Sequence, residues 1–236
     1  SPFIGSFIIH PFKNQSNWGR WGPNDQLGTI NLITDEKSRK ATDLVTDGIS
    51  VSCAWPITTD LPGEEDSQVL HYMITAGEGV DEEGAMDFIG MAYHGYSITH
   101  VDALCHVFWK DQMYNGLPAN LITARDKAAA ESIELLSDGV VTRGVLLDIP
   151  RNRNVDWLEP GDGITPEDLE AAETAQGVKV ESGDILLVRT GHLSRHHKSG
   201  PLDLSKGSPG TSAACIPWFR KRGIAMLGSD EANDVI

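Results

Sequence analysis

The sequence predicts a single α/β domain, and three observations lead to this fold class. Short apolar segments bounded by turn residues indicate buried strands, at 48–55, 144–149, 184–189 and 223–228. Helix-capping patterns lie between these segments in the second half of the chain, so that strands and helices alternate. No Ser/Pro-rich linker, low-complexity tract or internal repeat divides the 236 residues. We therefore expect one domain over 1–236, with 1–45 as an N-terminal arm.

Two helices are predicted from their end signals. Thr165 is a suitable N-cap, Pro166 suits the first helical position, and Gly177 is a stop signal. We expect this helix to cover a sheet. A second start, Thr-Ser-Ala-Ala at 211–214, leads towards Trp218 and should end before Gly223.

Composition narrows the choice of partners and compartment. With 34 acidic and 19 basic residues, the net charge of −15 argues against nucleic acid or an anionic membrane as partner. No apolar run is long enough to span a bilayer, and the first residues lack the basic region of a secretion signal. The three cysteines are too few and scattered for a disulfide framework or a thiolate zinc site. We expect a cytoplasmic protein that binds a small molecule.

Segment 94–106 carries the strongest functional signal, His-Gly-Tyr-Ser-Ile-Thr-His-Val-Asp-Ala-Leu-Cys-His. If 94–102 form a strand, alternate side chains point the same way, so that His94, His100 and Asp102 share one face. Imidazole and carboxylate groups are preferred ligands of catalytic divalent metals. Isolated polar residues are more often surface groups, but these are embedded among apolar neighbours, where burial without partners is costly. The segment therefore predicts a metal site with His100 and Asp102 as its chelating pair.

Two neighbouring residues leave alternatives open. His106 lies beyond the predicted strand, across a turn, where it either binds the metal or shuttles a proton as the catalytic residue. Cys105 is a conceivable nucleophile of a thiol-dependent hydrolase. The favoured interpretation of Cys105 is a small buried hydrophobic residue.

Thr99-His100-Val101-Asp102 followed by His106 resembles the His-x-Gly-Thr-His-x-Asp-x-Pro-x-His signature of the cyclase-like metal-dependent hydrolases, a family that includes bacterial kynurenine formamidase and isatin hydrolase. Tyr96 and Ile98 replace the first histidine and the glycine of that signature. His94 is expected to compensate for Tyr96. The resemblance extends to segments 17–22, 27–32, 143–148 and 188–191, which look like the longer branch of the family.

This resemblance implies the cyclase-type swivelling β/β/α fold and a water-activating Zn²⁺ or Mn²⁺. It also implies a homo-oligomer that hydrolyses an amide, lactam or lactone bond of a small cyclic or aryl substrate. The family supplies further ligands, a histidine and then a glutamate or glutamine, from a C-terminal segment for which this chain shows no counterpart. We therefore expect the C-terminal part of the family domain to be missing. The alternative is a catalytically silent small-molecule-binding or assembly relative with an incomplete metal site.

Aromatic residues near these motifs are candidates for substrate binding. Trp18, Trp21, Phe108 and Tyr114 are expected to line the substrate site, because aromatic faces offer apolar area and stacking. Large aromatics are as often core or subunit-contact residues. A histidine-rich stretch at 192–197 reads as an exposed loop, with His192 as the exception because it follows Arg-Thr-Gly.

Overall fold

The computed structural model describes residues 15–57, 69–78, 83–95, 98–200 and 204–235. These residues belong to two compact units. The first comprises the described residues up to Gly48 together with those from Asp102 onward, and the second comprises those from Ile49 to Val101. The single-domain organisation and the N-terminal arm stay predictions.

The first unit is built on a parallel sheet of three strands in the order β5-β7-β9. These strands are β5 (Gly144–Asp148), β7 (Ile185–Arg189) and β9 (Met226–Ser229). Their positions confirm the strands predicted at 144–149 and 184–189. The last strand begins later than predicted, because Gly223 ends the preceding helix in a left-handed conformation with φ of +68°.

Helix α4 (Pro166–Gln176) forms as predicted and is fixed at both ends. The Thr165 side chain accepts a hydrogen bond from the Asp168 backbone, and the Asp168 carboxylate accepts one from the Thr165 backbone at 2.8 Å. Arg153, in helix α3 (Ile149–Arg153), donates to the same carboxylate at 2.7 Å. Gly177 ends α4 with a left-handed backbone. The helix is therefore specified by its own sequence.

Helix α6 (Ile216–Arg222) begins later than the sequence predicts. Gly210 and Thr211 instead form β8, which pairs in parallel with β6 (Gly163–Ile164). A short 3₁₀ turn, Ala213–Cys215, then leads into the helix. The capping signal at 211–214 thus belongs to this turn rather than to α6 itself.

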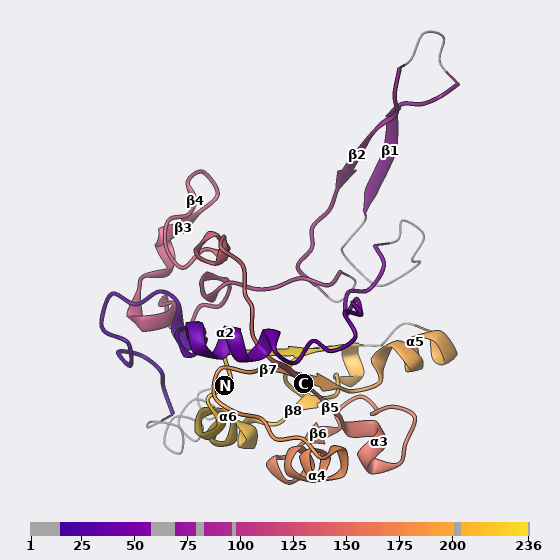
Figure 1. Ribbon diagram of the computed structural model, residues 1–236. Coiled ribbons are helices and arrows are strands. Elements are labelled where there is room, and N and C mark those ends of the chain that lie inside the picture. The colour runs from indigo at the N-terminus through magenta and orange to yellow at the C-terminus, as the bar shows by residue number, and fades with distance from the viewer. Residues whose placement is uncertain (1–14, 58–68, 79–82, 96–97, 201–203, 236) are drawn as a thin grey trace. The chain divides into compact units, whose positions relative to one another are not determined.

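One face of the parallel sheet forms the core of the first unit. Side chains alternate along β5 and β7, so that Val145 and Leu147 face the same side as Leu186 and Val188, and all four are buried. Helices α3, α4 and α6 gather on one side of the sheet (Figure 1). Leu169 and Ala172 of α4 and Trp218 of α6 belong to the same apolar cluster. The prediction that α4 covers a sheet is confirmed.

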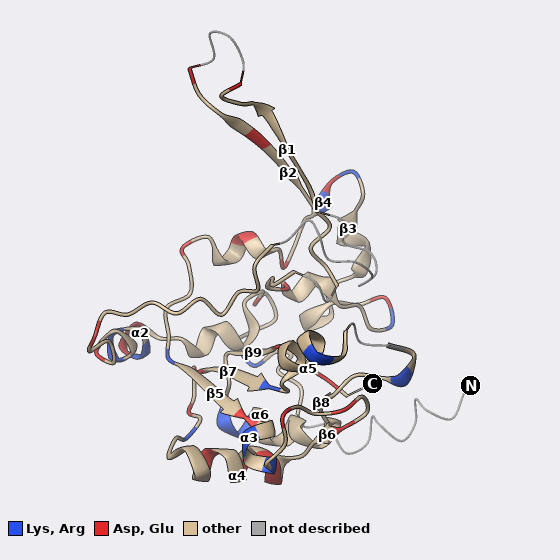
Figure 2. Cartoon of the chain, turned by 90° about the vertical axis from the view of Figure 1, so that its right-hand side faces the viewer, with Lys and Arg blue, Asp and Glu red and all other residues tan. Residues whose placement is uncertain are grey.

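A buried carboxylate connects helix α2 (Asp35–Thr42) to the start of β7. Asp184 is fully buried and accepts from Lys37 Nζ at 2.5 Å and from Arg143 Nη2 at 2.6 Å. Burial alone would raise the pKa of Asp184, but hydrogen bonds from Arg143 and Lys37 outweigh it and hold the pKa below its usual range. Acidic and basic residues also occur together along α2 (Figure 2).

The remaining elements of the first unit are short. Strands β3 (Ile122–Thr123) and β4 (Lys127–Ala128) form a small antiparallel hairpin. Helix α5 (His192–Ser199) follows β7. It occupies the stretch that the sequence predicts as an exposed loop, so that prediction is wrong, while the exception made for His192 is confirmed by its burial.

The second unit contains one antiparallel hairpin, β1 (Leu70–Thr75) and β2 (Met86–Gly90). The strand predicted at 48–55 is wrong. Residues of that segment are irregular, and Ile49 and Val51 are 77% and 79% exposed. An apolar, β-branched run becomes a strand only where a partner strand satisfies its backbone, and none pairs with it among the described residues.

Candidate functional site

The segment with the predicted metal ligands is not a strand. Residues 98–102 are irregular, and Tyr96 lies outside the described residues. The His100 ring bonds to the Ile98 carbonyl, two residues back, at 2.7 Å. This local bond uses a carbonyl that a strand would offer to its neighbour. The prediction that His94, His100 and Asp102 share one face of a β-strand is therefore wrong.

His94 and His100 lie close together in the second unit. Their ring centroids are 5.3 Å apart in an edge-on arrangement, and Tyr93 lies 4.9 Å from the His94 ring. Because a carbonyl only accepts, Nδ1 of His100 donates to Ile98, so the lone pair of the neutral ring is at Nε2. A backbone partner of this kind is what orients and holds the tautomer of a metal-binding histidine.

Asp102 and His106 face each other in the first unit. Asp102 Oδ1 lies 3.9 Å from His106 Nδ1, and their side chains are 41% and 42% exposed. His106 ends a 3₁₀ turn, Leu104–His106, closed by a bond from its backbone nitrogen to the Ala103 carbonyl at 3.0 Å. A carboxylate and an imidazole at this separation are chemically suited to one divalent ion. The turn before His106 is as the sequence predicts.

The surroundings of Cys105 suit a structural residue rather than a nucleophile. Its backbone nitrogen donates to the Glu131 carbonyl at 3.3 Å, and its side chain is half-buried. Burial raises the pKa of the Cys105 thiol, with the charge of Glu131 adding to the effect. A thiol held protonated is a poor nucleophile. This environment argues against the thiol-dependent alternative.

The predicted aromatic residues have different surroundings. Tyr114 is half-buried and donates from its hydroxyl to Asp25 at 2.9 Å. Trp21 lies beneath the guanidinium of Arg20, 4.6 Å from ring centroid to Cζ. Trp18 and Phe108 are 47% and 49% exposed. Tyr114 and Trp21 thus have structural contacts, and the substrate-binding role of all four aromatics stays a prediction.

The two N-terminal segments that resemble the family, 17–22 and 27–32, lie near the turn at Tyr114 and Asn115. Asp25 accepts from the Gly28 backbone, from Asn31 and from the Tyr114 hydroxyl. The Asn115 amide donates to the Gly22 carbonyl at 2.9 Å. Segments 17–22 and 27–32 are therefore held as a defined structure.

A polar cluster at the carboxyl edge of the parallel sheet was missed by sequence reasoning. Asp230, just after β9, accepts from Thr190 Oγ1 at 2.9 Å and from the backbone of Gly191 and His192. His192 Nδ1 lies 2.7 Å from Glu231 Oε2, and both side chains are buried. Ligands of open α/β sheets bind at this edge. The available signal was that two strands end in polar residues, at Thr190 and at Ser229-Asp230.

Among the described residues, no helix is both long enough and apolar enough to cross a membrane.

Comparisons with known proteins identify a family and a fold that cover most of the chain. The Cyclase family model, described as "Putative cyclase", matches residues 12–233. A crystal structure of a novel cyclase matches with a TM-score of 0.82 at 29% identity, covering 93% of this chain and 77% of that chain. Isatin hydrolase A from Labrenzia aggregata, bound to benzyl benzoate, has a TM-score of 0.46 at 19% identity, covering 79% of this chain and 67% of that one. No curated protein matches the sequence.

Proposed function

Because the chain belongs to the Cyclase family and has its α/β fold, we propose that it is a metal-dependent hydrolase. Its substrate would be a small cyclic or aryl molecule with an amide, lactam or lactone bond. The observation that carries the proposal is the retained Thr99-His100-x-Asp102 core with His106, in which a backbone carbonyl fixes the tautomer of His100. The polar residues of this core have no evident use in packing, since Asp102 and His106 are exposed.

His94, His100 and Asp102 are the residues assigned to hold Zn²⁺ or Mn²⁺. Imidazole and carboxylate ligands suit either ion, so the choice between them depends on availability as well as on the site. When bound, such an ion lowers the pKa of water towards about 7 and polarises the carbonyl under attack. The bond from His100 to the Ile98 carbonyl supports the assignment, because it leaves Nε2 as the coordinating nitrogen of a neutral ring.

His106 is assigned the proton transfers. Its ring would accept the proton of the attacking water and return it to the leaving nitrogen or oxygen. Asp102 at 3.9 Å would stabilise the ring while it carries the proton. The exposure of His106 is consistent with access to substrate. Phe108, close by in the sequence and exposed, is proposed together with Trp18, Trp21 and Tyr114 to contact the substrate body.

The first test is metal analysis of the purified chain by mass spectrometry, before and after chelation and reloading. Near-stoichiometric Zn²⁺ or Mn²⁺ is expected, and His100→Ala and Asp102→Ala should each lose most of it. His197→Ala is the matched control, because His197 is an exposed histidine on α5 and should leave the metal content unchanged. Normal occupancy in both ligand variants would remove the assignment.

Turnover of His106→Ala separates the two roles left open for that residue. On a panel of cyclic amides, lactones and aryl formamides, the variant should keep its metal and lose about 10²–10⁴ in rate. Loss of metal as well would make His106 a ligand. If the metal-loaded chain hydrolyses nothing on the panel, the chain is a binding or assembly relative, which the replacement at Tyr96 favours.

A further inference from the structure

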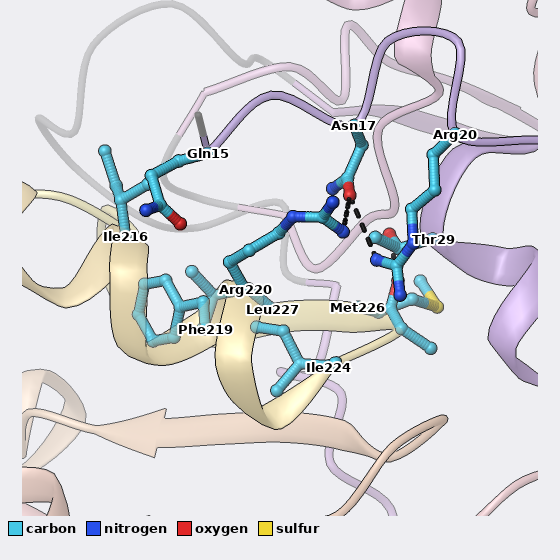
Figure 3. A pocket seen from close by; sticks show the side chains of 12 residues that line it. Gln15, Asn17, Arg20, Thr29, Ile216, Phe219, Arg220, Ile224, Met226 and Leu227 are labelled. Atoms are coloured by element: carbon cyan, nitrogen blue, oxygen red, sulfur yellow. Dashed lines mark hydrogen bonds between the residues drawn. The ribbon is translucent and has the colours of Figure 1, made fainter. Parts of the chain in front are cut away.

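A cavity of about 240 Å³ opens in the first unit between the N-terminal segment and the α6–β9 connection (Figure 3). Its two sides differ in chemistry. The apolar side comes from α6 and the start of β9. The polar side comes mainly from the segment around Asn17, with Arg220 reaching across from α6. The lining includes Asn17, Arg20, Thr29, Phe219, Arg220 and Ile224.

Two arginines converge on one neutral oxygen at the mouth of this cavity. Arg20 Nη1 lies 3.1 Å and Arg220 Nη1 lies 2.6 Å from Asn17 Oδ1. Figure 3 shows the two guanidinium groups approaching Asn17 from different sides. An amide oxygen accepts hydrogen bonds but carries no net charge. The arrangement therefore brings two cations together without neutralising either.

Several other arginines of this unit have carboxylate partners. Arg143, Arg153, Arg189 and Arg222 each form an ion pair at 3.2 Å or less. In the part of the chain that the structure describes, no carboxylate pairs with Arg20 or Arg220, although the chain has 34 acidic residues. Burial lowers the pKa of Arg20, and repulsion from Arg220 lowers it further. Two like charges left together in an acidic protein are suited to an anion from outside the chain.

The pair is also held in place from several directions. The Tyr114 hydroxyl oxygen, which donates to Asp25, also lies 3.3 Å from the Asn17 carbonyl oxygen, and Thr29 Oγ1 donates to the Ala225 carbonyl at 2.8 Å. Trp21 stacks on the Arg20 guanidinium. Groups that are ordered before binding lose less conformational entropy when a ligand arrives. These contacts make the cavity a built site rather than a chance meeting of two flexible side chains.

We propose that this cavity binds a small organic carboxylate, with its carboxylate between Arg20 and Arg220 and its apolar body against Phe219 and Ile224. Guanidinium groups bind carboxylates through short, charge-assisted hydrogen bonds. The apolar wall adds a favourable contact that an inorganic anion lacks. None of the residues that line the cavity is assigned to metal binding or to proton transfer, although Trp21 and Tyr114, which contact Arg20 and Asn17, are also proposed to contact the hydrolysed substrate.

Isothermal titration of the purified full chain with phenylacetate tests the proposal. Saturable binding is expected, at least about tenfold tighter than binding of inorganic phosphate, because only phenylacetate uses the apolar wall. 2-Phenylethanol, which has the same ring without the carboxylate, should not bind detectably. Equal binding of phosphate, or binding of 2-phenylethanol as tight as that of phenylacetate, would overturn the proposal.

Asn17→Asp is the sharpest variant, since it places a carboxylate of the same shape between the two arginines. Phenylacetate affinity should fall by at least about tenfold, and the thermal midpoint of unfolding should rise or stay unchanged. Arg125→Ala, at an exposed position outside the cavity, removes one positive charge and should leave phenylacetate binding unchanged. Arg220→Gln should weaken binding as Asn17→Asp does. Unchanged affinity in a folded Asn17→Asp or Arg220→Gln variant contradicts the proposed site.

Discussion

The β5-β7-β9 sheet and the β1-β2 hairpin are both rich in apolar residues, but only the sheet buries them. Leu186 in β7 is fully buried, whereas Ile89 in β2 is 53% exposed. Along β5 and β7 buried residues alternate with less buried ones, while most of the hairpin residues are exposed. The sheet has α4 and α6 against one face. Apolar β-strands become a core only where another layer covers them.

In the β1-β2 hairpin, by contrast, most residues are exposed, and the second unit has no helix among its described residues to cover it. Tyr72 and Phe88 stack on each other with ring centroids 5.1 Å apart, yet they are 56% and 40% exposed. A contiguous exposed apolar surface of this kind is typical of interaction sites. The homo-oligomer predicted from the family resemblance would supply a cover, and the hairpin is the surface on which we expect a second copy to bind.

The largest expected effect comes from truncating one leucine in the sheet. Leu186→Ala should lower the free energy of unfolding by about 2–5 kcal/mol, because it leaves a cavity in a filled core. Ile89→Ala should change it by less than about 0.5 kcal/mol if the hairpin faces water. Urea unfolding followed by circular dichroism measures both.

Protein concentration then decides what covers the hairpin. Destabilisation by Leu186→Ala should not depend on concentration, since the core lies within one chain. A loss in Ile89→Ala that shrinks as the protein is diluted would mean that a second copy covers β2 in the native protein, because the contribution of an interface disappears once both proteins dissociate. Sedimentation velocity of the same samples checks that dilution changes the oligomeric state.

A buried acid in the first unit provides the second prediction. Glu131 is 1% exposed, and its carboxylate oxygens have no hydrogen-bond partner among the described residues. Burial raises its pKa from 4.5 to about 7 in the folded protein. The unfolded chain therefore loses this proton first, so folding stability falls as pH rises from 4.5 to about 7 and then levels off. The total loss is about 3 kcal/mol, at 1.36 kcal/mol for each pKa unit.

Glu131→Gln should remove this pH dependence, because an amide does not ionise. The variant should be about as stable as the native protein near pH 4.5 and more stable than it above pH 7. Unfolding midpoints across this pH range are the measurement. Glu134→Gln, at an exposed glutamate nearby, is the control and should keep the native profile. A Glu131→Gln profile as steep as the native one would contradict the assignment.

The parts of the fold that follow from sequence are those fixed by local signals or by dense apolar runs. Thr165, Pro166 and Gly177 define α4 within one short segment, and Leu146-Leu147 and Leu186-Leu187 identify two buried strands. The strand predicted at 94–102 does not form over its described residues, for a physical reason. Alternating residues have the same spacing whether or not a partner strand exists, and here the His100 ring takes the Ile98 carbonyl instead.

The candidate sites likewise differ in whether their residues lie close together in the sequence. The ligand segment is readable because His100, Asp102 and His106 are close in sequence. The Asn17–Arg220 contact joins residues that are 203 positions apart, and the His192–Glu231 pair joins the ends of different strands. No local pattern marks such contacts, because they arise only when β7, β9 and α6 pack together. Long-range polar sites therefore had to come from the structure.

The smallest expected effect tests what stabilises the helices that cover the sheet. The two possibilities are contacts within the helix's own segment and contacts with residues far away in sequence. Helix α4 begins with its own cap at Thr165, whereas α5 begins at Gly191 without a side-chain cap of its own and relies on Asp230. Thr165→Ala should cost about 1 kcal/mol of unfolding free energy, since one backbone donor loses its acceptor. Thr165→Ser keeps the hydroxyl and should cost only a fraction of that. If both variants unfold like the native protein in urea, packing of α4 on β5 and β7 outweighs its cap, and the layer rather than the local signal sets the helix.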